Sequence, residues 1–193
     1  MLVIPPADRP SGSPFRFRLS VDFGTTAWDP TLLSAWGQEV WGGGTLGGSS
    51  GESEAVSMDL LYRCELADLL KSEPEILYTD DGGKKTDILV TIDGAPVGVS
   101  VTRAMTYAAG DPCSAVNTEA LTTLMTRKVG DLQLSQANAV PADHWDRSML
   151  YVIACDAAHA DATAAIFDAL DPAVKADAIL VVAVSEGDDA FLY

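Results

Sequence analysis

The sequence has little positive charge and no long apolar run. Lysine and arginine together account for 12 of the 193 residues, against 28 aspartates and glutamates, which gives a formal net charge of −16 at pH 7. This balance argues against a broad basic surface of the kind that binds nucleic acid tightly. No run of about 18 apolar residues occurs, so no segment is expected to cross a membrane as a helix.

Cysteine is also scarce. Cys64, Cys113 and Cys155 are odd in number and far apart in the chain. No pair has the spacing of zinc ligands or of a disulfide framework, so a reducing compartment is expected. The first residues lack a basic stretch followed by an apolar one, which argues against a secretory signal, while their arginines leave organelle targeting open. We therefore expect an intracellular protein of the cytoplasm or nucleus, with its oligomeric state left open.

The chain does have enough apolar residues for a core, because 48% of its residues are hydrophobic. Two parts are expected. Residues 1–49 hold several prolines, three of the four tryptophans and most of the glycine-rich stretch WGGGTLGGSSG. Such a composition is typical of an N-terminal arm or linker, and disorder there is a possibility. Residues 50–193 are expected to form one folded domain.

The apolar spacing within this domain predicts a regular alternation of elements. A helix is expected over 50–73, ended by Pro74. Asp93-Gly94 lies between two apolar runs and is a strong hairpin signal. The other expected elements are strands over 75–81, 86–92 and 97–105, a helix over 117–132, a strand over 147–155, a helix over 158–170 and a strand over 176–185. This order predicts an α/β fold whose mixed central sheet contains an antiparallel three-strand meander, with later strands joined through flanking crossover helices.

Polar residues gather on two neighbouring strands of the meander. Asp87 opens the second strand, while Ser100 and Thr102 alternate along the third. With the acidic helix before them, these residues resemble the core of the PD-(D/E)xK nuclease superfamily, which has the restriction-endonuclease-like fold, over roughly residues 50 to 190. The resemblance implies a divalent-metal-dependent, nuclease-like domain that uses Mg²⁺ or Mn²⁺ to hydrolyse phosphodiesters.

Two signature positions depart from that superfamily. Ser100 stands where the family has the metal-binding Glu, and Thr102 stands where it has the Lys that positions or activates water. A hydroxyl is a poor anchor for Mg²⁺, and Thr is not a cation. We therefore expect Asp87, with one or both of Glu54 and Glu75, to hold the metal. The cationic role at the phosphate would pass to Arg103 or Lys128.

Each of these site residues also has a purely structural interpretation. Asp87 follows a glycine turn and can cap it, Ser100 and Thr102 can form a cross-strand hydroxyl pair, and Arg103 can pair with a surface carboxylate. The loss of both charged signature residues therefore favours, almost equally, a catalytically inactive nuclease-fold module used for binding or scaffolding. A small-molecule enzyme unrelated to nucleic acids is a third hypothesis. Nucleic acid remains a candidate partner, although the acidic charge balance does not support it, and no membrane partner is expected.

The motif GVSVTRAM also resembles a narrower group of eukaryotic proteins that carries it nearly verbatim. The likeness extends into LMTRKVGDL and the strand MLYVIAC. It implies the nuclease-like fold without an established reaction.

Overall fold

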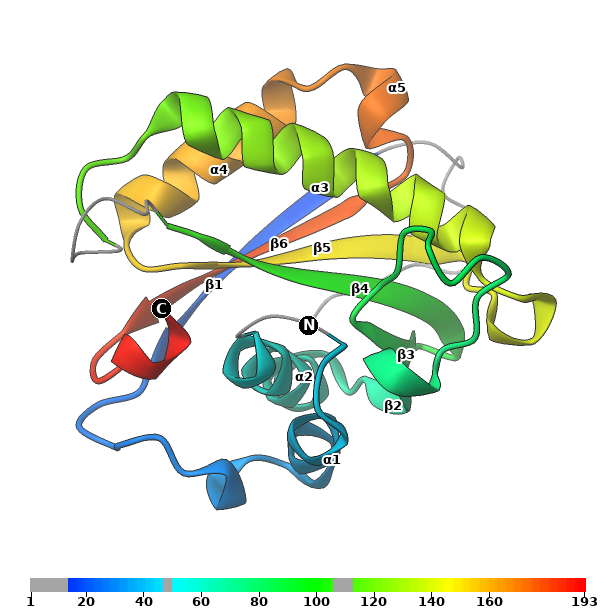
Figure 1. Cartoon of the computed structure of the whole chain (residues 1–193). Helices are drawn as coiled ribbons and strands as arrows, with labels where there is room; N and C mark the ends of the chain where they lie inside the picture. The colour runs from blue at the N-terminus through cyan, green and yellow to red at the C-terminus, as the bar shows by residue number, and fades with distance from the viewer. Residues whose placement is uncertain (1–13, 47–49, 106–112) are drawn as a thin grey trace.

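The computed structural model describes residues 14–46, 50–105 and 113–193, and its centre is one six-stranded mixed sheet (Figure 1). The strands follow the order β1-β6-β5-β4-β3-β2 across the sheet. Their bounds are β1 (Phe15–Asp22), β2 (Asp68–Ser72), β3 (Ile88–Ile92), β4 (Ala95–Ala104), β5 (Arg147–Ala154) and β6 (Ile179–Glu186). The pairs β1–β6, β6–β5 and β5–β4 are parallel, whereas β4, β3 and β2 form an antiparallel meander. The expected mixed α/β class is confirmed.

Helices cover both faces of this sheet. Figure 1 shows α3, α4 and α5 on one face and α1 and α2 on the other. The α-helices are α1 (Ala35–Gly43), α2 (Gly51–Glu65), α3 (Thr118–Asn138), α4 (Ala157–Ala169) and α5 (Pro172–Lys175). Short 3-10 helices are η1 (Pro30–Leu32), η2 (Glu73–Glu75), η3 (Pro141–Asp143) and η4 (Ala190–Leu192). Within the described ranges, no helix is both long and apolar enough to span a bilayer.

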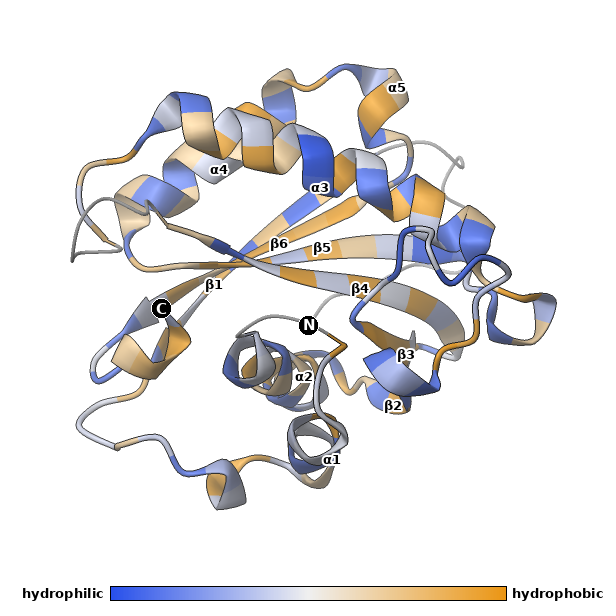
Figure 2. Ribbon diagram, viewed as in Figure 1, coloured by the Kyte–Doolittle hydropathy of each residue, from blue (hydrophilic) through white to orange (hydrophobic). Residues whose placement is uncertain are grey.

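The central strands are buried on both faces of the sheet. Because successive side chains of a strand point to opposite faces, their residues fall into two separate apolar clusters. Val99, Tyr151 and Val181 belong to the cluster packed against α1 and α2. Leu150 and Leu180, one position away, belong to the cluster under α3 and α4. Figure 2 shows hydrophobic colours along these strands and mixed colours on the helices. Two apolar layers separated by one sheet therefore form the core.

The expectation of an N-terminal arm is wrong for the part of residues 1–49 that the structure describes. β1 adds to the edge of the sheet in parallel with β6, with Phe15 opposite Ile179, and α1 packs against α2. The apolar–polar alternation FRFRLSVD explains this placement, because one face of β1 meets the core while Arg16 and Arg18 pair with Asp168 and Asp161 of α4. Residues 1–13 and 47–49, which include most of the targeting candidate at residues 1–19 and part of the glycine-rich stretch, lie outside the described residues.

The helix expected over 50–73 ends earlier than its periodicity indicates. α2 stops at Glu65, Leu66 adopts a left-handed conformation with φ of 56°, and the chain turns into β2. Consequently β2, not residues 75–81, is the first strand of the meander. The expected strand over 75–81 is replaced by the end of η2 and an extended stretch that makes one isolated bridge, between Tyr78 and Ala139. Apolar leucines continue at helical spacing past the true end, which is why periodicity alone misplaced it.

Gly98 of β4 is required by the packing of a tryptophan. A Cβ at Gly98 would lie 2.4 Å from Cε2 of Trp145, which is fully buried and donates from Nε1 to Ser148 Oγ at 2.9 Å. We expect Gly98→Ala to lower the free energy of unfolding by about 1–3 kcal/mol, the usual cost of overpacking, in urea titrations at unchanged m-value. Gly130→Ala in α3, where a Cβ meets no atom within 4 Å, should leave stability unchanged or raise it slightly. Equal effects of the two variants would contradict this reading of Gly98.

Candidate functional site

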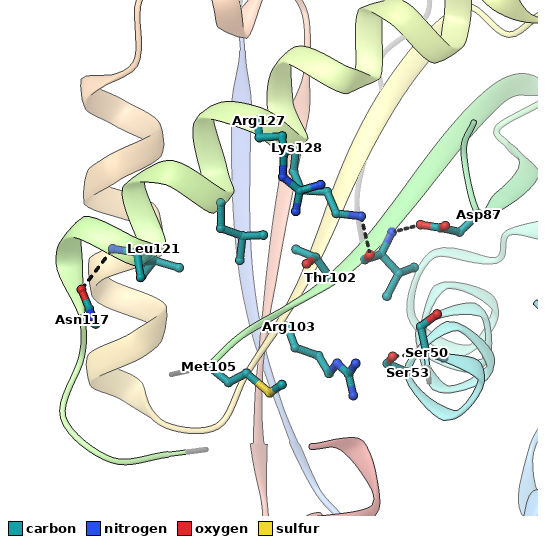
Figure 3. Close-up of a pocket in the computed structure, with 13 residues that line it drawn as sticks. Ser50, Ser53, Asp87, Thr102, Arg103, Met105, Asn117, Leu121, Arg127 and Lys128 are labelled. Atoms are coloured by element: carbon teal, nitrogen blue, oxygen red, sulfur yellow. Dashed lines mark hydrogen bonds between the residues drawn. The ribbon is translucent and has the colours of Figure 1, made fainter. Parts of the chain in front are cut away.

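The candidate site lies at the edge of β4, beyond the point where β3 stops pairing with it. β3 accompanies β4 only from Ala95 to Val99, whereas β5 continues alongside β4 to Ala104. The last residues of β4 therefore have an open edge on the β3 side. The N-terminal turn of α2 reaches this edge from one face of the sheet and the middle of α3 from the other (Figure 3).

Asp87 occupies the open edge and takes over the role of a strand neighbour. Its Oδ2 accepts a hydrogen bond from the backbone N–H of Val101 at 2.5 Å and another from Ser100 Oγ at 3.1 Å. Its own backbone N–H donates to Val99 O at 3.1 Å. The carboxylate is thus fixed in place by the strand that carries the GVSVTRAM motif, and Ser100 orients it.

Two glutamates converge on Asp87 and form an acidic cluster, defined as Glu54, Glu73 and Asp87. One carboxylate oxygen from each lies within 4.8 Å of the others. Glu54 stands in the first turn of α2, is 2% exposed, and accepts a hydrogen bond from Ser50 Oγ at 2.6 Å. Glu73 begins η2 and accepts from the backbone N–H of Leu46 at 2.8 Å. The cluster thus draws one residue each from α2, η2 and the position just before β3, and it could hold a metal ion.

Burial, together with the charge of Asp87 in the case of the two glutamates, raises the pKa values of these carboxyl groups. Burial, followed by the charge of Asp87, raises the pKa of Glu54 to about 8. Burial also raises the pKa of Glu73 and that of Asp87. The nearby ammonium of Lys128 opposes each of the three shifts. A cluster of this kind is stabilised by a proton or by a cation that neutralises it.

Of the sequence-predicted metal ligands, the structure brings Asp87 and Glu54 together but not Glu75. The carboxylate of Glu75 instead accepts from the backbone N–H and the hydroxyl of Ser72, at 2.9 and 2.8 Å, as the capping box of η2. These bonds lower the pKa of the exposed Glu75. Glu73 takes the position that Glu75 was expected to fill. The Ser-x-x-Glu spacing from Ser72 to Glu75 is a capping-box signature, and it is the signal that could have separated the two glutamates.

A cavity of about 630 Å³ opens beside Asp87, along the open edge of β4 between α2 and α3. Thr102 and Arg103 line it from β4, and Arg127 and Lys128 line it from α3 (Figure 3). Lys128 Nζ donates to Val101 O at 3.5 Å, and Arg103 Nη1 donates to Leu192 O at 3.0 Å. Each of the five residues predicted to be catalytic therefore either lines this cavity or, as Ser100 does, contacts Asp87. Arg127 was not among them, although its neighbour Lys128 was.

The cations of the cavity differ from most others among the described residues. Six Lys or Arg side chains form ion pairs with carboxylates: Arg16, Arg18, Arg63, Lys71, Lys84 and Arg147. Within the described part of the chain, Arg103, Arg127 and Lys128 form no such pair. The expectation that Arg103 pairs with a surface carboxylate is therefore not met there. Three side chains that carry positive charge and form no direct ion pair therefore line this cavity, next to the acidic cluster.

A second group with metal-ligating side chains lies at the start of α4, where Cys155, Asp156 and His159 approach one another. Asp156 is the N-cap of α4, and its Oδ1 accepts from the backbone N–H of His159 at 2.7 Å. The His159 ring nitrogen Nδ1 lies 2.9 Å from the same oxygen. Helix capping accounts for this grouping, so we do not assign it a function.

Comparison with known proteins adds a partial relative and a distant structural likeness. No protein family description matches the chain. A Dictyostelium discoideum protein, the AAC-rich mRNA clone AAC4 protein, is 36% identical over 124 residues; the match spans 63% of this chain but 18% of that protein. The structure of Pyrococcus furiosus SfsA in complex with Ca²⁺ aligns with 72% of this chain and 58% of that one, at 13% identity and a TM-score of 0.32. At that TM-score the likeness supports no functional statement, so the function has to be argued from the geometry of the site.

Proposed function

We propose that this chain is a divalent-metal-dependent phosphodiester hydrolase built on a restriction-endonuclease-like core. The observation that carries the proposal is the convergence of Glu54, Glu73 and Asp87 within 4.8 Å, beside a cavity lined by Lys128. The order of elements from α2 to β5, a helix, three strands, a helix and a strand, supports it, because the resemblance found in the sequence implies this order.

The donor set suits a hard divalent cation such as Mg²⁺ or Mn²⁺. Such ions prefer carboxylate oxygens, and the cluster offers three carboxylates from three different elements. Burial, with a smaller contribution from the charge of Asp87, raises the pKa of Glu54 and Glu73, and a bound cation would favour their ionised forms. When bound, the ion would act as a Lewis acid on a phosphoryl oxygen.

The side chains around the cluster have distinct proposed roles. Asp87, fixed by Val101 and Ser100, would orient the bound ion. Lys128 would place its ammonium where negative charge grows on the phosphate. Arg103 of β4 would add a second positive charge to the cavity. On this proposal Lys128 supplies the cation that Thr102 cannot, and Ser100 serves as a positioning residue for Asp87 in place of a ligand.

A catalytically inactive binding module is the second candidate, and one observation favours it. Oδ2 of Asp87 already accepts two hydrogen bonds, from Val101 N–H and Ser100 Oγ, as a purely structural carboxylate would. In such a module the acidic cluster would only join α2, η2 and β3, and the cavity would bind an anion without cleaving it.

The two candidates are separated by a hydrolysis assay on the full chain with bis(p-nitrophenyl) phosphate. The enzyme is expected to release p-nitrophenol only with Mg²⁺ or Mn²⁺, and a chelator should stop the reaction. Lys128→Gln should reduce kcat by about 10²–10³-fold, the usual effect of losing one group that stabilises transition-state charge. Lys84→Gln, which removes a lysine paired with Asp131 outside the cavity, should keep the wild-type rate. If the folded chain releases no p-nitrophenol in the presence of either metal, the hydrolase function is wrong and the binding module remains.

A further inference from the structure

The charge pattern of the cavity bears on the size of the ligand that it accepts. Arg103, Arg127 and Lys128 line one cavity, Arg103 on the α2 side of β4 and the other two on α3 (Figure 3), whereas most other cations of the described residues pair with carboxylates. The chain as a whole carries a net charge of −16. Three cations and one carboxylate, that of Asp87, line this cavity, so its lining favours an anion, whereas the net negative charge of the chain disfavours one elsewhere.

A long nucleic acid fits this pattern poorly. Duplex DNA carries one charge per about 1.7 Å of its axis, and proteins that bind it neutralise many phosphates with rows of Lys and Arg. Here Arg16 and Arg18 of β1 are engaged by Asp168 and Asp161, so they provide no track for flanking phosphates. Phosphates that extend beyond the cavity would meet a chain whose net charge is −16.

The cavity has the dimensions and lining of a site for one small molecule. Its volume of about 630 Å³ lies within the roughly 300–1,000 Å³ typical of pockets for small ligands. Apolar side chains also line the cavity: Met105, which follows β4, and Leu121 and Leu124 of α3. Asn117, the N-cap of α3, adds an amide at the same end of the cavity (Figure 3). Apolar side chains beside cations suit a molecule with both a flat ring system and a phosphate.

We propose that the natural substrate is a phosphodiester of dinucleotide size, and not the interior of a long strand or duplex. This inference rests on the proposed hydrolase function. The bridging phosphate would lie between the acidic cluster and Lys128, with one nucleoside against Leu121 and Leu124 and a terminal phosphate near Arg127. Hydrolysis adds one water across the P–O ester bond, which leaves a phosphate monoester on one nucleoside and a hydroxyl on the other.

The direct test compares substrates of different length with the same full chain in Mn²⁺. The probes are the 5′-phosphorylated dinucleotides of DNA and of RNA, a 30-residue single strand of each, and a 30-base-pair DNA duplex. We expect kcat/KM for at least one dinucleotide to exceed that for every longer substrate by tenfold or more. The deoxy and ribo arms decide which sugar is accepted. Equal or faster cleavage of any long substrate would overturn the size limit while leaving the hydrolase function intact.

Matched variants test whether the residues of the cavity bind the dinucleotide. Leu124→Ser should raise KM for the dinucleotide fivefold or more with kcat little changed, whereas Leu134→Ser, at an exposed position of the same helix, should leave both unchanged. Arg127→Gln should weaken binding similarly, whereas Arg18→Gln, which removes a cation paired with Asp161, should not. Identical KM values for Leu124→Ser and wild type would contradict the apolar subsite.

Binding without catalysis separates this inference from the proposed function. In chelator, the dinucleotide should raise the Tm of the wild type and not that of Arg127→Gln. If no phosphodiester is hydrolysed but this shift occurs, the hydrolase function fails and the dinucleotide site stands. If neither hydrolysis nor a shift occurs, both are overturned.

Discussion

Replacing Asp87 by Asn is expected to abolish stabilisation by Mn²⁺ or Mg²⁺ and to reduce hydrolysis by at least about 10²-fold. The wild-type Tm should rise in millimolar metal, because an ion that binds only the folded chain at 100 times its Kd adds about 2.7 kcal/mol. Asn has nearly the same shape as Asp and can still accept from Val101 N–H, so the fold of the edge should survive. The variant loses the negative charge of Asp87, which the cluster needs in order to bind a cation.

The matched control is Asp146→Asn, an exposed aspartate outside the cluster. It removes the same charge from the chain and should retain the full metal-dependent rise in Tm. Thermal unfolding with and without metal, on wild type and both variants, makes the comparison. A metal-induced rise in the Asp87→Asn variant as large as that in the wild type would remove Asp87 from any metal site.

The second large effect concerns Glu54 and the pH dependence of the metal-free protein. The folded chain raises the pKa of Glu54 from 4.5 to about 8, because its carboxyl group is buried and lies near Asp87. Between these two pH values the folded state keeps a proton that the unfolded state releases. Stability therefore falls as pH rises from about 4.5 to about 8, by an amount on the order of 2–4 kcal/mol.

Glu54→Gln should remove most of this decline, because glutamine is neutral at every pH in the interval. In chelator, the variant is expected to unfold at higher urea concentration than the wild type at pH 8 and at a similar concentration at pH 5. Glu52→Gln, in the same turn of α2 but outside the cluster, should follow the wild-type curve. If the stability of the wild type does not fall more steeply between pH 5 and 8 than that of Glu54→Gln, Glu54 does not keep a buried proton in the folded chain.

The sequence was informative where structure is determined locally. Asp93-Gly94 predicted the hairpin between β3 and β4, and both residues have positive φ there, 53° and 78°. Because that hairpin sets the register of β4, Asp87 could be placed beside Ser100 from the sequence alone. The helical spacing over 117–132 likewise predicted α3, which carries Lys128 to the edge of β4.

The errors arose where distant segments decide the structure. β1 pairs with β6, which lies near the other end of the chain, so no local sequence pattern identifies this partner. The apolar–polar alternation of β1 itself was visible in the sequence. The left-handed turn at Leu66 breaks α2 without the glycine that usually marks such a turn. That break moved the first meander strand upstream and brought Glu73, not Glu75, to the cluster. The choice between these two glutamates depended on Ser72, whose capping bonds hold Glu75 away.

The exchange of Glu and Lys for Ser100 and Thr102 has a structural consequence that the sequence alone did not settle. Ser100 donates to Asp87 and so remains part of the edge, while Thr102 faces the cavity below Lys128. The charges that the motif lacks are present nearby, on Glu54, Glu73 and Lys128, each from a different element. In the proposed hydrolase these scattered groups therefore act together on one cation.

The most direct measurement of this joint action is the anomalous diffraction of Mn²⁺ in crystals of the full chain grown or soaked with the ion near pH 8. The account predicts an anomalous peak with carboxylate oxygens of Asp87 and Glu54 within about 2.0–2.6 Å, with Glu73 next to it. Asp87→Asn crystals should lack the peak. Manganese bound only elsewhere, for example beside Cys155, Asp156 and His159, with the acidic cluster empty at saturating Mn²⁺, would contradict the account.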